Sequence, residues 1–386
     1  MPRSIVLKKR FFAPSFRELI QPLSRILPRT PRLESRGNRP LQMTFEDQLN
    51  ALIFFHLEEH TSARHLVQVL QDDEFARNNI APEGGISRSS FSEAVNERGL
   101  EQFMYVFGQL QKQAGSILPK RYSDLGDLVS IDGSLIDAVL SMSWADYRNG
   151  SKKARFHLGF NINRGVPQKL FLTDGKGDER PFVHQILEPG QTGIMDRGYQ
   201  HHKNFDELQE EQKHFVCRIK ENTIKTCMEQ YNTVSGGKVF YDAKVLLGRP
   251  GAKQTQRPVR LVGYKADDVT YRVATDRFDL TAEDITRIYK LRREVEKFFA
   301  WWKRHLRVYH LIARSKHGLT VQILSGLITY LLLAIYCHEH HGEHVTIKRV
   351  GELRIKIQNE LRDIENAAPD PGAPSCEHTE ILYANP

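Results

Sequence analysis

The sequence predicts an α/β protein in which a mixed sheet carries helices on its faces. Strand-like and helical segments alternate between residues 128 and 220, and a second group of strand-like segments precedes a long helix. Hydrophobic residues make up 40% and charged residues 26% of the 386 residues, which is typical of a folded protein and excludes wholesale disorder. The four cysteines form no CxxC pair, which argues against a zinc ribbon or a secreted disulfide framework and favours a reducing cytoplasm.

Residues 1–44 are predicted to form a basic arm. Residues 1–40 contain ten Lys and Arg and two acidic residues, and this difference of +8 equals the net charge of the whole chain. A basic arm on a neutral body is typical of a protein that binds a polyanion, because each phosphate contact releases a condensed counterion. The alternatives are a disordered tail without a partner and an Arg-rich transit peptide. A secretory signal is not indicated, because no apolar stretch precedes a small-residue cleavage site.

Apolar residues at helical spacing predict several short helices over residues 45–119, a region expected to bind nucleic acid. A Gly-rich turn at 82–85 leads into a segment in which Ser87 is expected to cap a helix that Gly99 ends. A turn followed by a helix that begins with Arg88 is compatible with a helix-turn-helix reader. A packing helix with a polar face is the alternative, and the sequence leaves both open.

Residues 120–222 show the alternation expected of a mixed sheet. Expected strands cover 128–132, 154–162, 167–174, 192–196 and 214–220, and expected helices cover 180–187 and 198–211. The second and third strands form a hairpin around the turn at 163–165. The order of strand, hairpin, helix, strand, helix and strand predicts a mixed sheet with helices packed on it.

Residues 223–280 look like a small antiparallel unit inserted into this sheet protein. Its expected strands cover 239–246, 259–265 and 269–275. One continuous helix is expected to follow from Thr281 to Leu306, with Thr281 and Asp284 at capping-box spacing.

Residues 281–340 are predicted to complete the core. The apolar segment 319–337 is interrupted by polar residues, which favours a helix buried in the core over a membrane span. Residues 341–386 are expected to hold a final helix and, from about Ala367, a disordered tail rich in Pro, Gly and Ser.

Two predicted strands end in an acidic residue that stands close to a glycine. Asp132 ends the first strand before Gly133, and Asp196 ends the fourth strand shortly before Gly198. A single acid at a strand end is commonly a turn or cap residue. Two of them point to a site, since ligands gather at the carboxyl ends of strands in mixed sheets.

The expected long helix supplies a third carboxylate. Tyr289, Arg292, Glu296 and Lys303 lie within about 60° of one another on an ideal helix, beside its apolar face. Three carboxylates without a Cys or His cluster suit Mg²⁺ or Mn²⁺, and two such ions can support in-line phosphoryl transfer. Arg292 and Lys303 would then hold phosphate oxygens, and Tyr289 would contact a phosphate or a base. The alternative is a solvated helix face with an Arg292–Glu296 pair.

Four segments of the chain resemble the IS4 family of bacterial insertion-sequence transposases. They are SIDGS around Asp132, IMDRGY around Asp196, FVCRIKEN at 215–222, and Y-x2-R-x3-E-x6-K from Tyr289 to Lys303. The resemblance implies an RNase H-like core with Asp132, Asp196 and Glu296 as a metal-binding DDE triad, and a β-rich insertion before the third acid. It also implies cutting and joining of double-stranded DNA at element ends, by a dimer assembled on DNA in the bacterial cytoplasm.

The chain departs from one feature of that family. Some members place a tryptophan in the insertion to stack on a flipped base, whereas Trp144, Trp301 and Trp302 all lie outside 223–280. Tyr241, Phe240 or Tyr264 are candidates to replace it, and whether a DNA hairpin intermediate forms stays open.

Other groupings and functions remain as alternatives. Asp174, Asp178 and Glu179 form a second acidic cluster, for which a turn is the simpler interpretation, and the histidines at 338–344 are expected to end a helix without binding metal. A non-catalytic DNA-binding regulator that uses the arm and the Arg88 region, or a nuclease that cuts without joining, would also fit the basic residues.

Overall fold

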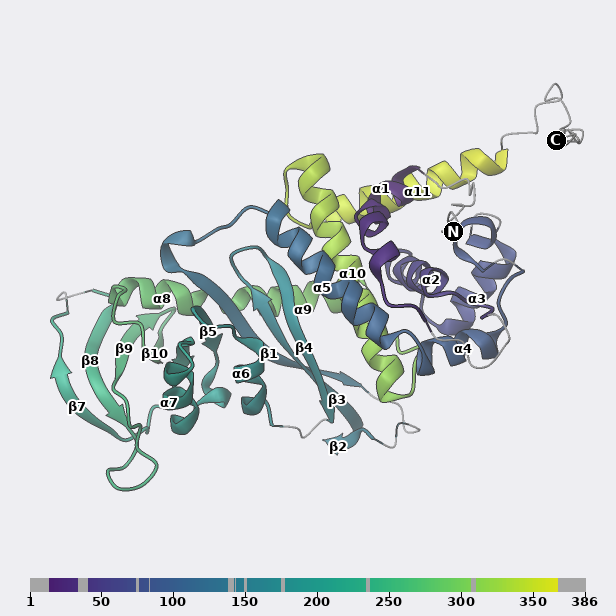
Figure 1. The fold of residues 1–386 in the computed structure, drawn as a ribbon. Helices are drawn as coiled ribbons and strands as arrows, with labels where there is room; N and C mark the ends of the chain where they lie inside the picture. The colour runs from purple at the N-terminus through teal and green to yellow at the C-terminus, as the bar shows by residue number, and fades with distance from the viewer. Residues whose placement is uncertain are drawn as a thin grey trace, which may run out of the picture.

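The computed structural model describes residues 14–33, 41–73, 76–82, 84–137, 142, 144–148, 151–174, 178–233, 237–306 and 310–366. In Figure 1 a helical part that contains the first and the last described helices stands on one side, a sheet lies in the middle, and the strands of residues 223–280 extend the sheet at the far side. The expected tail from Ala367 and residues 1–13 of the arm lie outside the described residues.

Within the described residues, the sheet has ten strands in the order β2-β3-β1-β5-β6-β10-β9-β8-β7, with β4 paired to β3. Their bounds are β1 Asp127–Asp137, β2 Asp146–Arg148, β3 Ser151–Asn161, β4 Val166–Asp174, β5 Gln191–Met195, β6 His214–Arg218, β7 Lys225–Gln230, β8 Val239–Leu247, β9 Val259–Ala266 and β10 Val269–Thr275. Strands β4, β3 and β1 are antiparallel neighbours, and β5 and β6 run parallel to β1. Three antiparallel strands followed by two parallel ones are the arrangement of an RNase H-like core, and the predicted fold class is confirmed.

The strands of residues 223–280 continue this sheet. β10 pairs antiparallel with β6 through Thr275 and Val216, and β9, β8 and β7 follow in turn. The sequence did not predict β7, because its side chains are almost all exposed and show no alternation of apolar and polar residues.

Helices cover both faces of the sheet. Their bounds are α1 Pro14–Ile20, α2 Phe45–Leu57, α3 Ala63–Asp72, α4 Arg88–Glu97, α5 Leu100–Ile117, α6 Val183–Ile186, α7 His202–Glu210, α8 Ala282–Lys290, α9 Arg293–His305, α10 Lys316–His341 and α11 Ile347–Asn366. On one face Phe298, Phe299 and Trp302 of α9 pack against Phe156 and Phe160 of β3. On the other face α6 and α7 enclose a second apolar cluster. The sheet is therefore buried from both sides.

The expected continuous helix from Thr281 to Leu306 is wrong at one point. Thr281 caps α8 with the expected capping box, but α8 ends at Lys290 and α9 begins at Arg293. Between them Arg292 N–H bonds Tyr289 C=O, and Glu294 N–H bonds Leu291 C=O, so i→i+3 bonds replace the α-helical pattern. Regular 100° steps consequently do not relate Tyr289 to the residues of α9.

The apolar segment 319–337 lies inside α10. This helix is long and apolar enough to cross a membrane by length and composition, yet 89% of its most apolar window is buried inside the protein. It packs against α2, α4 and α5, which surround it in Figure 1. The predicted burial of this helix in the core is confirmed.

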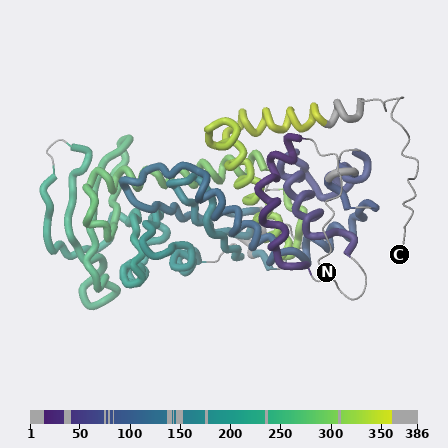
Figure 2. Tube along the Cα trace, turned by 45° about the horizontal axis from the view of Figure 1, so that its top comes forward, coloured from purple at the N-terminus to yellow at the C-terminus, as the bar shows by residue number. Residues whose placement is uncertain are grey.

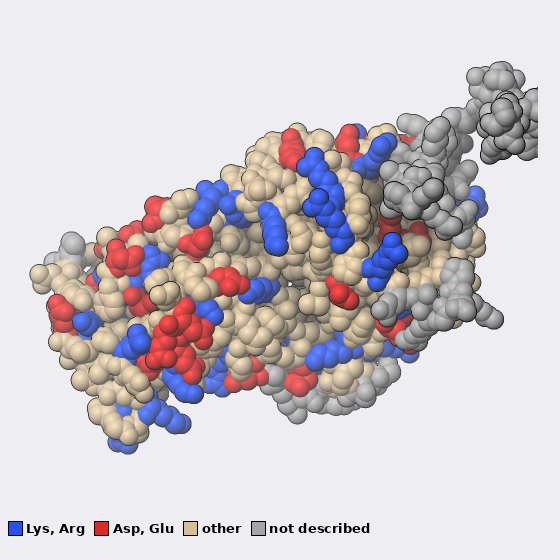
Figure 3. Space-filling model, viewed as in Figure 1, with Lys and Arg blue, Asp and Glu red and all other residues tan. Residues whose placement is uncertain are grey.

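Part of the expected basic arm packs against the helical part, a contact that its charge count did not predict. Phe16, Leu19, Leu23 and Ile26 are buried in the main core, and the Ser15 hydroxyl donates to Glu360 of α11 at 2.7 Å. Figure 2 shows α11 lying across these first helices. The apolar residues between the arginines of the arm explain this packing, because they form a buried face that a count of charges does not reveal. On the face in Figure 3, basic and acidic side chains are mixed.

His56 joins the helical part to the core. Its imidazole bonds the Leu306 carbonyl at 2.6 Å and the Ser325 hydroxyl at 3.0 Å, and the side chain is fully buried. Burial lowers the pKa of His56 to about 4, while its two backbone hydrogen bonds act in the opposite direction. The folded protein therefore disfavours the protonated form of His56, and the reason is burial of the charge.

His56 should make the protein sensitive to mild acid. Its pKa is about 4 in the folded protein and 6.5 in an ordinary exposed imidazole, so the unfolded chain binds the proton first and stability falls as pH falls below 6.5. Urea unfolding at about pH 7 and about pH 4.5 should show that His56→Gln loses less free energy of unfolding than the unsubstituted chain, by about 2–3 kcal/mol. His340→Gln, at an exposed histidine, should leave the pH dependence unchanged. Equal pH dependence in all three proteins would contradict the assignment to His56.

Candidate active site

Asp132 lies within β1, not at its end as the sequence predicted. Pairing between β1 and β5 stops at Ser130 and Ile194, while β1 continues to Asp137 on β3. Side chains alternate along a strand, so Ser130 and Asp132 face the same side, on which the Ser130 hydroxyl lies 3.5 Å from the Arg292 carbonyl. The strand continues because β3 remains its partner, and Asp132 stands where β1 and β5 separate.

Asp196 follows the last residue of β5, as predicted. Its carboxylate accepts from Gly198 N–H at 2.7 Å and caps the short turn Arg197–Tyr199. A Cβ at Gly198 would lie 3.0 Å from Asp196 Oδ1, which explains the glycine at this position. Because β5 lies next to β1, the chain brings Asp196 to the same edge of the sheet as Asp132.

Arg292 connects Asp132 and Glu296. One guanidinium nitrogen lies 2.6 Å from Glu296 Oε1 and the other lies 3.8 Å from Asp132 Oδ2. Arg292 stands at the start of α9, so Glu296 is one helical turn further on and faces the same way. The arginine thus links the third acid on the helix with the first acid on the sheet, and it is not only a partner of Glu296.

The electrostatics of Asp132 reflect this crowding. Burial raises its pKa to about 6, while Arg292 and the Gly133 N–H lower it and the carboxylates of Asp196 and Glu296 raise it further. The two other acids therefore lie close enough to act on Asp132.

The donor set suits a hard divalent cation, since it consists of carboxylate oxygens. Among the described residues, no three His, Cys, Asp or Glu side chains are grouped tightly enough to hold one ion. The Arg292 guanidinium lies between Asp132 and Glu296. Binding of metal would therefore require Arg292 to release Glu296.

Lys303 and Tyr289 lie on either side of these acids. Lys303 Nζ donates to the Leu135 carbonyl at 3.1 Å, three residues along β1 from Asp132, and lies 5.9 Å from the centre of the Phe156 ring. Tyr289 is only 6% exposed and its ring lies 6.0 Å from that of Tyr271. Burial raises the pKa of Tyr289, and Arg292 acts in the opposite direction.

Arg88 lies apart from the acids, at the exposed first turn of α4 in the helical part. Ser87 caps this helix by accepting from Ser90 N–H at 3.1 Å, as expected. Asn96, on the same helix, accepts from Arg314 N–H and Ser315 N–H at the start of α10. This end of α4 is therefore a packing surface, while its first turn is exposed.

A cavity of about 500 Å³ adjoins Arg292 and Glu296. Its lining combines five cations, three tyrosines and three acids: Arg218, Lys290, Arg292, Arg293, Lys297, Tyr264, Tyr271, Tyr289, Asp267, Glu294 and Glu296. The rings of Tyr264 and Tyr271 are stacked 5.1 Å apart, and the Arg218 guanidinium lies 4.7 Å from the centre of the Tyr271 ring. Tyr264 is thus the one of the three aromatic candidates from residues 223–280 that lines this cavity.

Tyr199 is a site residue that the sequence analysis did not single out. Its hydroxyl is buried without a hydrogen-bond partner among the described residues. Burial raises its pKa well above the usual value, and the Asp132 and Asp196 carboxylates add to the effect. Its place three residues after Asp196, inside the segment IMDRGY, was the signal that could have identified it. Arg218, in the segment FVCRIKEN, was missed in the same way.

Comparison with known proteins identifies the family. The model of the transposase DDE domain matches residues 124–332. A protein of Sinorhizobium fredii that carries the transposase name y4zB is 28% identical over 68% of this chain and 74% of its own length. A probable transposase for insertion sequence element IS5377 of Geobacillus stearothermophilus is 27% identical over 57% of this chain and 59% of its own length.

A protein of Synechocystis named as a transposase for insertion sequence element IS4SA is 23% identical over 68% of this chain and 75% of its own length. A solved piggyBac transposase synaptic complex with hairpin DNA aligns at a TM-score of 0.46 and 11% identity, over 93% of this chain and 82% of that one. The domain match covers more than half of the chain and includes Asp132, Asp196 and Glu296, and the protein therefore belongs to the family of transposases that share this DDE domain.

Proposed function

We propose that the protein cuts DNA at the ends of an insertion sequence and joins those ends to target DNA, with Asp132, Asp196 and Glu296 as its catalytic residues. The observation that carries the proposal is the arrangement of the acids: Arg292 lies between Asp132 and Glu296, and Asp196 follows β5, the parallel neighbour of β1. A group of carboxylates is suited to holding divalent cations, which stabilise the ionised forms.

The three acids would hold Mg²⁺ or Mn²⁺, as two ions, and the metal would supply charge stabilisation and an activated oxygen nucleophile. Arg292, released from Glu296, is suited to hold two non-bridging phosphate oxygens through its fork. Lys303 would add a point charge further along β1, and Tyr289 a ring and a hydroxyl at the cavity edge. Their work is positioning and neutralisation of developing charge, without transfer of a proton.

The cavity lined by Tyr264, Tyr271 and Arg218 supports a nucleic-acid substrate. Aromatic rings stack on bases and guanidinium groups bind phosphates, and this combination is typical of sites that accept a single strand. Double-stranded DNA from element ends and target is the proposed partner, with a dimer assembling on it in the bacterial cytoplasm. Arg88, exposed on α4, is a further candidate contact to the DNA backbone.

Replacing any one of the three acids should abolish cleavage without abolishing binding of DNA. Asp132→Ala, Asp196→Ala and Glu296→Ala each remove a ligand, so Mg²⁺-dependent nicking of a duplex that carries the element end should fall by at least about 1,000-fold. Gel-shift binding should persist, since phosphate contacts carry most of the affinity. Asp174→Ala, at the second acidic cluster, is the matched control and should still cut.

Full cleavage by any of the three variants would contradict the assignment of the triad. Binding of DNA without nicking by the unsubstituted protein, at any Mg²⁺ or Mn²⁺ concentration, would favour the non-catalytic regulator. Nicking without strand transfer would favour the nuclease.

Asp132→Asn should stabilise the metal-free protein. The pKa of Asp132 is about 6 in the folded protein, above the usual 3.8 of an exposed aspartate, so the folded state disfavours the carboxylate. This destabilisation is fully present above pH 6 and disappears below 3.8. Urea unfolding in EDTA should show a gain of about 2–3 kcal/mol for Asp132→Asn near pH 8 and little gain near pH 4. A stability loss near pH 8 would show that Arg292 outweighs burial at Asp132.

Arg292→Lys should be more harmful than Lys303→Arg. An ammonium cannot reach both Asp132 and Glu296 or hold a phosphate in two places, so Arg292→Lys should slow cleavage by about 10- to 100-fold. Lys303→Arg keeps a cation near Leu135 and should slow cleavage by less than about 10-fold. Single-turnover cleavage at saturating DNA measures both. Near-normal cleavage by Arg292→Lys would reduce Arg292 to a partner of Glu296 within the helix.

A further inference from the structure

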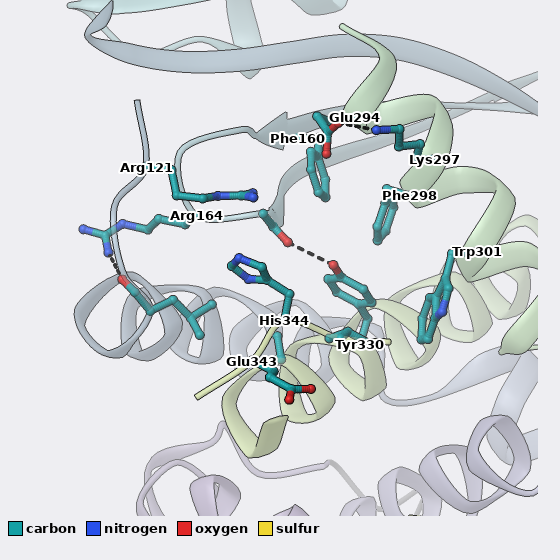
Figure 4. Close-up of a pocket in the computed structure, with 14 residues that line it drawn as sticks. Arg121, Phe160, Arg164, Glu294, Lys297, Phe298, Trp301, Tyr330, Glu343 and His344 are labelled. Atoms are coloured by element: carbon teal, nitrogen blue, oxygen red, sulfur yellow. Dashed lines mark hydrogen bonds and ion pairs between the residues drawn. The ribbon is translucent and has the colours of Figure 1, made fainter. Parts of the chain in front are cut away.

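A second cavity, of about 280 Å³, lies on α9 away from the three acids (Figure 4). The loop after β3, α9, α10 and the turn before α11 enclose it. In Figure 4 the Arg121 guanidinium points toward the cavity from one side, Lys297 stands above it, and His344 and Tyr330 lie in its centre.

Positive charge in this cavity exceeds negative charge. Its two acids are already paired, Glu294 with Lys297 at 2.7 Å and Glu343 with Arg349 at 2.7 Å. Arg121 has no carboxylate partner among the described residues: its Nη2 lies 3.4 Å from the Ile162 carbonyl and its Nε has no partner.

Arg164 also lines the cavity and donates to the Leu118 carbonyl, and within the described part of the chain no carboxylate pairs with it. Burial lowers the pKa of His344, and Arg121 lowers it further. Arg121, a cation without an acidic partner among the described residues, is suited to bind an anion.

One wall of the cavity is aromatic. The Tyr330 ring lies 4.8 Å from Phe298 and 5.5 Å from Trp301, edge to face in both cases, and its hydroxyl donates to the Gly165 carbonyl at 3.0 Å. An aromatic wall of this kind can pack against the apolar face of a ring that is attached to the anion. A DNA phosphate with its deoxyribose has both the negative charge and such a ring.

The two cavities are adjacent along α9, because Glu294 and Lys297 line both of them. A strand that leaves the acids over α9 would reach the second cavity next. We propose that this cavity binds a backbone phosphate of the DNA, with Arg121 on the phosphate and the sugar against Tyr330 and Trp301. The inference rests on the proposed function for its ligand, and the contact lies outside the catalytic centre.

The test compares Arg121→Gln with Arg121→Lys. Both lose the contact to the Ile162 carbonyl, so they share any effect on folding, and only the lysine keeps the charge. Binding of a short random-sequence duplex is measured by fluorescence anisotropy in EDTA over a range of salt, so that cleavage does not enter. Arg121→Gln should weaken binding by about 3- to 10-fold and lower the slope of log affinity against log salt by about 0.9. Arg121→Lys should restore most of the slope.

Lys203→Gln, at an exposed cation of α7, is the remote control and should bind as the unsubstituted protein does. An unchanged slope in Arg121→Gln would overturn the inference even if the unsubstituted protein cuts DNA. If the slope of log affinity against log salt falls in Arg121→Gln although the unsubstituted protein binds DNA and never cuts it, the inference holds and the proposed function fails.

A third arm separates DNA from free phosphate. Thermal unfolding is followed with inorganic phosphate as the only added anion. Stabilisation that disappears in Arg121→Gln, together with unchanged DNA binding, would assign the cavity to free phosphate and overturn the DNA contact. Weakened DNA binding in the same variant sustains it.

Discussion

The site depends on the ion pairs that Arg292 makes with Asp132 and Glu296. Carboxylates from a strand and a helix meet in a half-buried place, where burial raises the pKa of Asp132 and the carboxylates of Asp196 and Glu296 act in the same direction. A single guanidinium reaches two of them, at 3.8 and 2.6 Å, and so joins the helix to the sheet. A planar group with two separate nitrogens can make both contacts at once, which an ammonium cannot.

The position of Arg292 follows from the break between α8 and α9. If the helix continued through residues 290–293, the Tyr289 and Glu296 side chains would be fixed by regular 100° steps. Instead i→i+3 bonds tighten the chain at Leu291, and the Ser130 hydroxyl approaches the Arg292 carbonyl. This irregular turn lies over the point where β1 and β5 stop pairing. The break in the sheet and the i→i+3 hydrogen bonds between α8 and α9 therefore occur at the same place. Deviations from regular structure concentrated at a functional site are expected of proteins.

Much of the fold could be predicted from the sequence because its signals are local. Alternation predicted β3, the polar interruptions in 319–337 predicted that α10 is a buried helix, and the capping-box spacing at Thr281 predicted the start of α8. The features that were not predicted depend on distant partners. Asp132 is interior to β1 because β3 continues to pair with it, and β7 forms because it pairs with the edge of β8. The charge count of the arm took no account of Phe16 and Leu19, which are buried where α1 packs against α11, more than 300 residues away.

For the site, spacing predicted residue types but not their partners. Asp132, Asp196, Arg292 and Glu296 were identified from strand ends and one helix, yet the bridge by Arg292 needs β1 and α9 to pack together. Tyr199 and Arg218 were overlooked because neither carries a spacing of its own, and only burial without a hydrogen-bond partner, or stacking on Tyr271, distinguishes them.

The helix α9 serves two purposes on different sides. Arg292 lies between Asp132 and Glu296, Trp301 lines the second cavity, and Glu294 and Lys297 line both cavities. Phe299 and Trp302 pack against Phe156 of β3. A helix has room for such a division because residues three and four apart share a side and their neighbours do not. The apolar anchor fixes the rotation of the helix, so a change that moved Trp302 would shift both polar sides together. The packing of α9 against β3 therefore fixes the positions of its acidic and basic side chains at the same time.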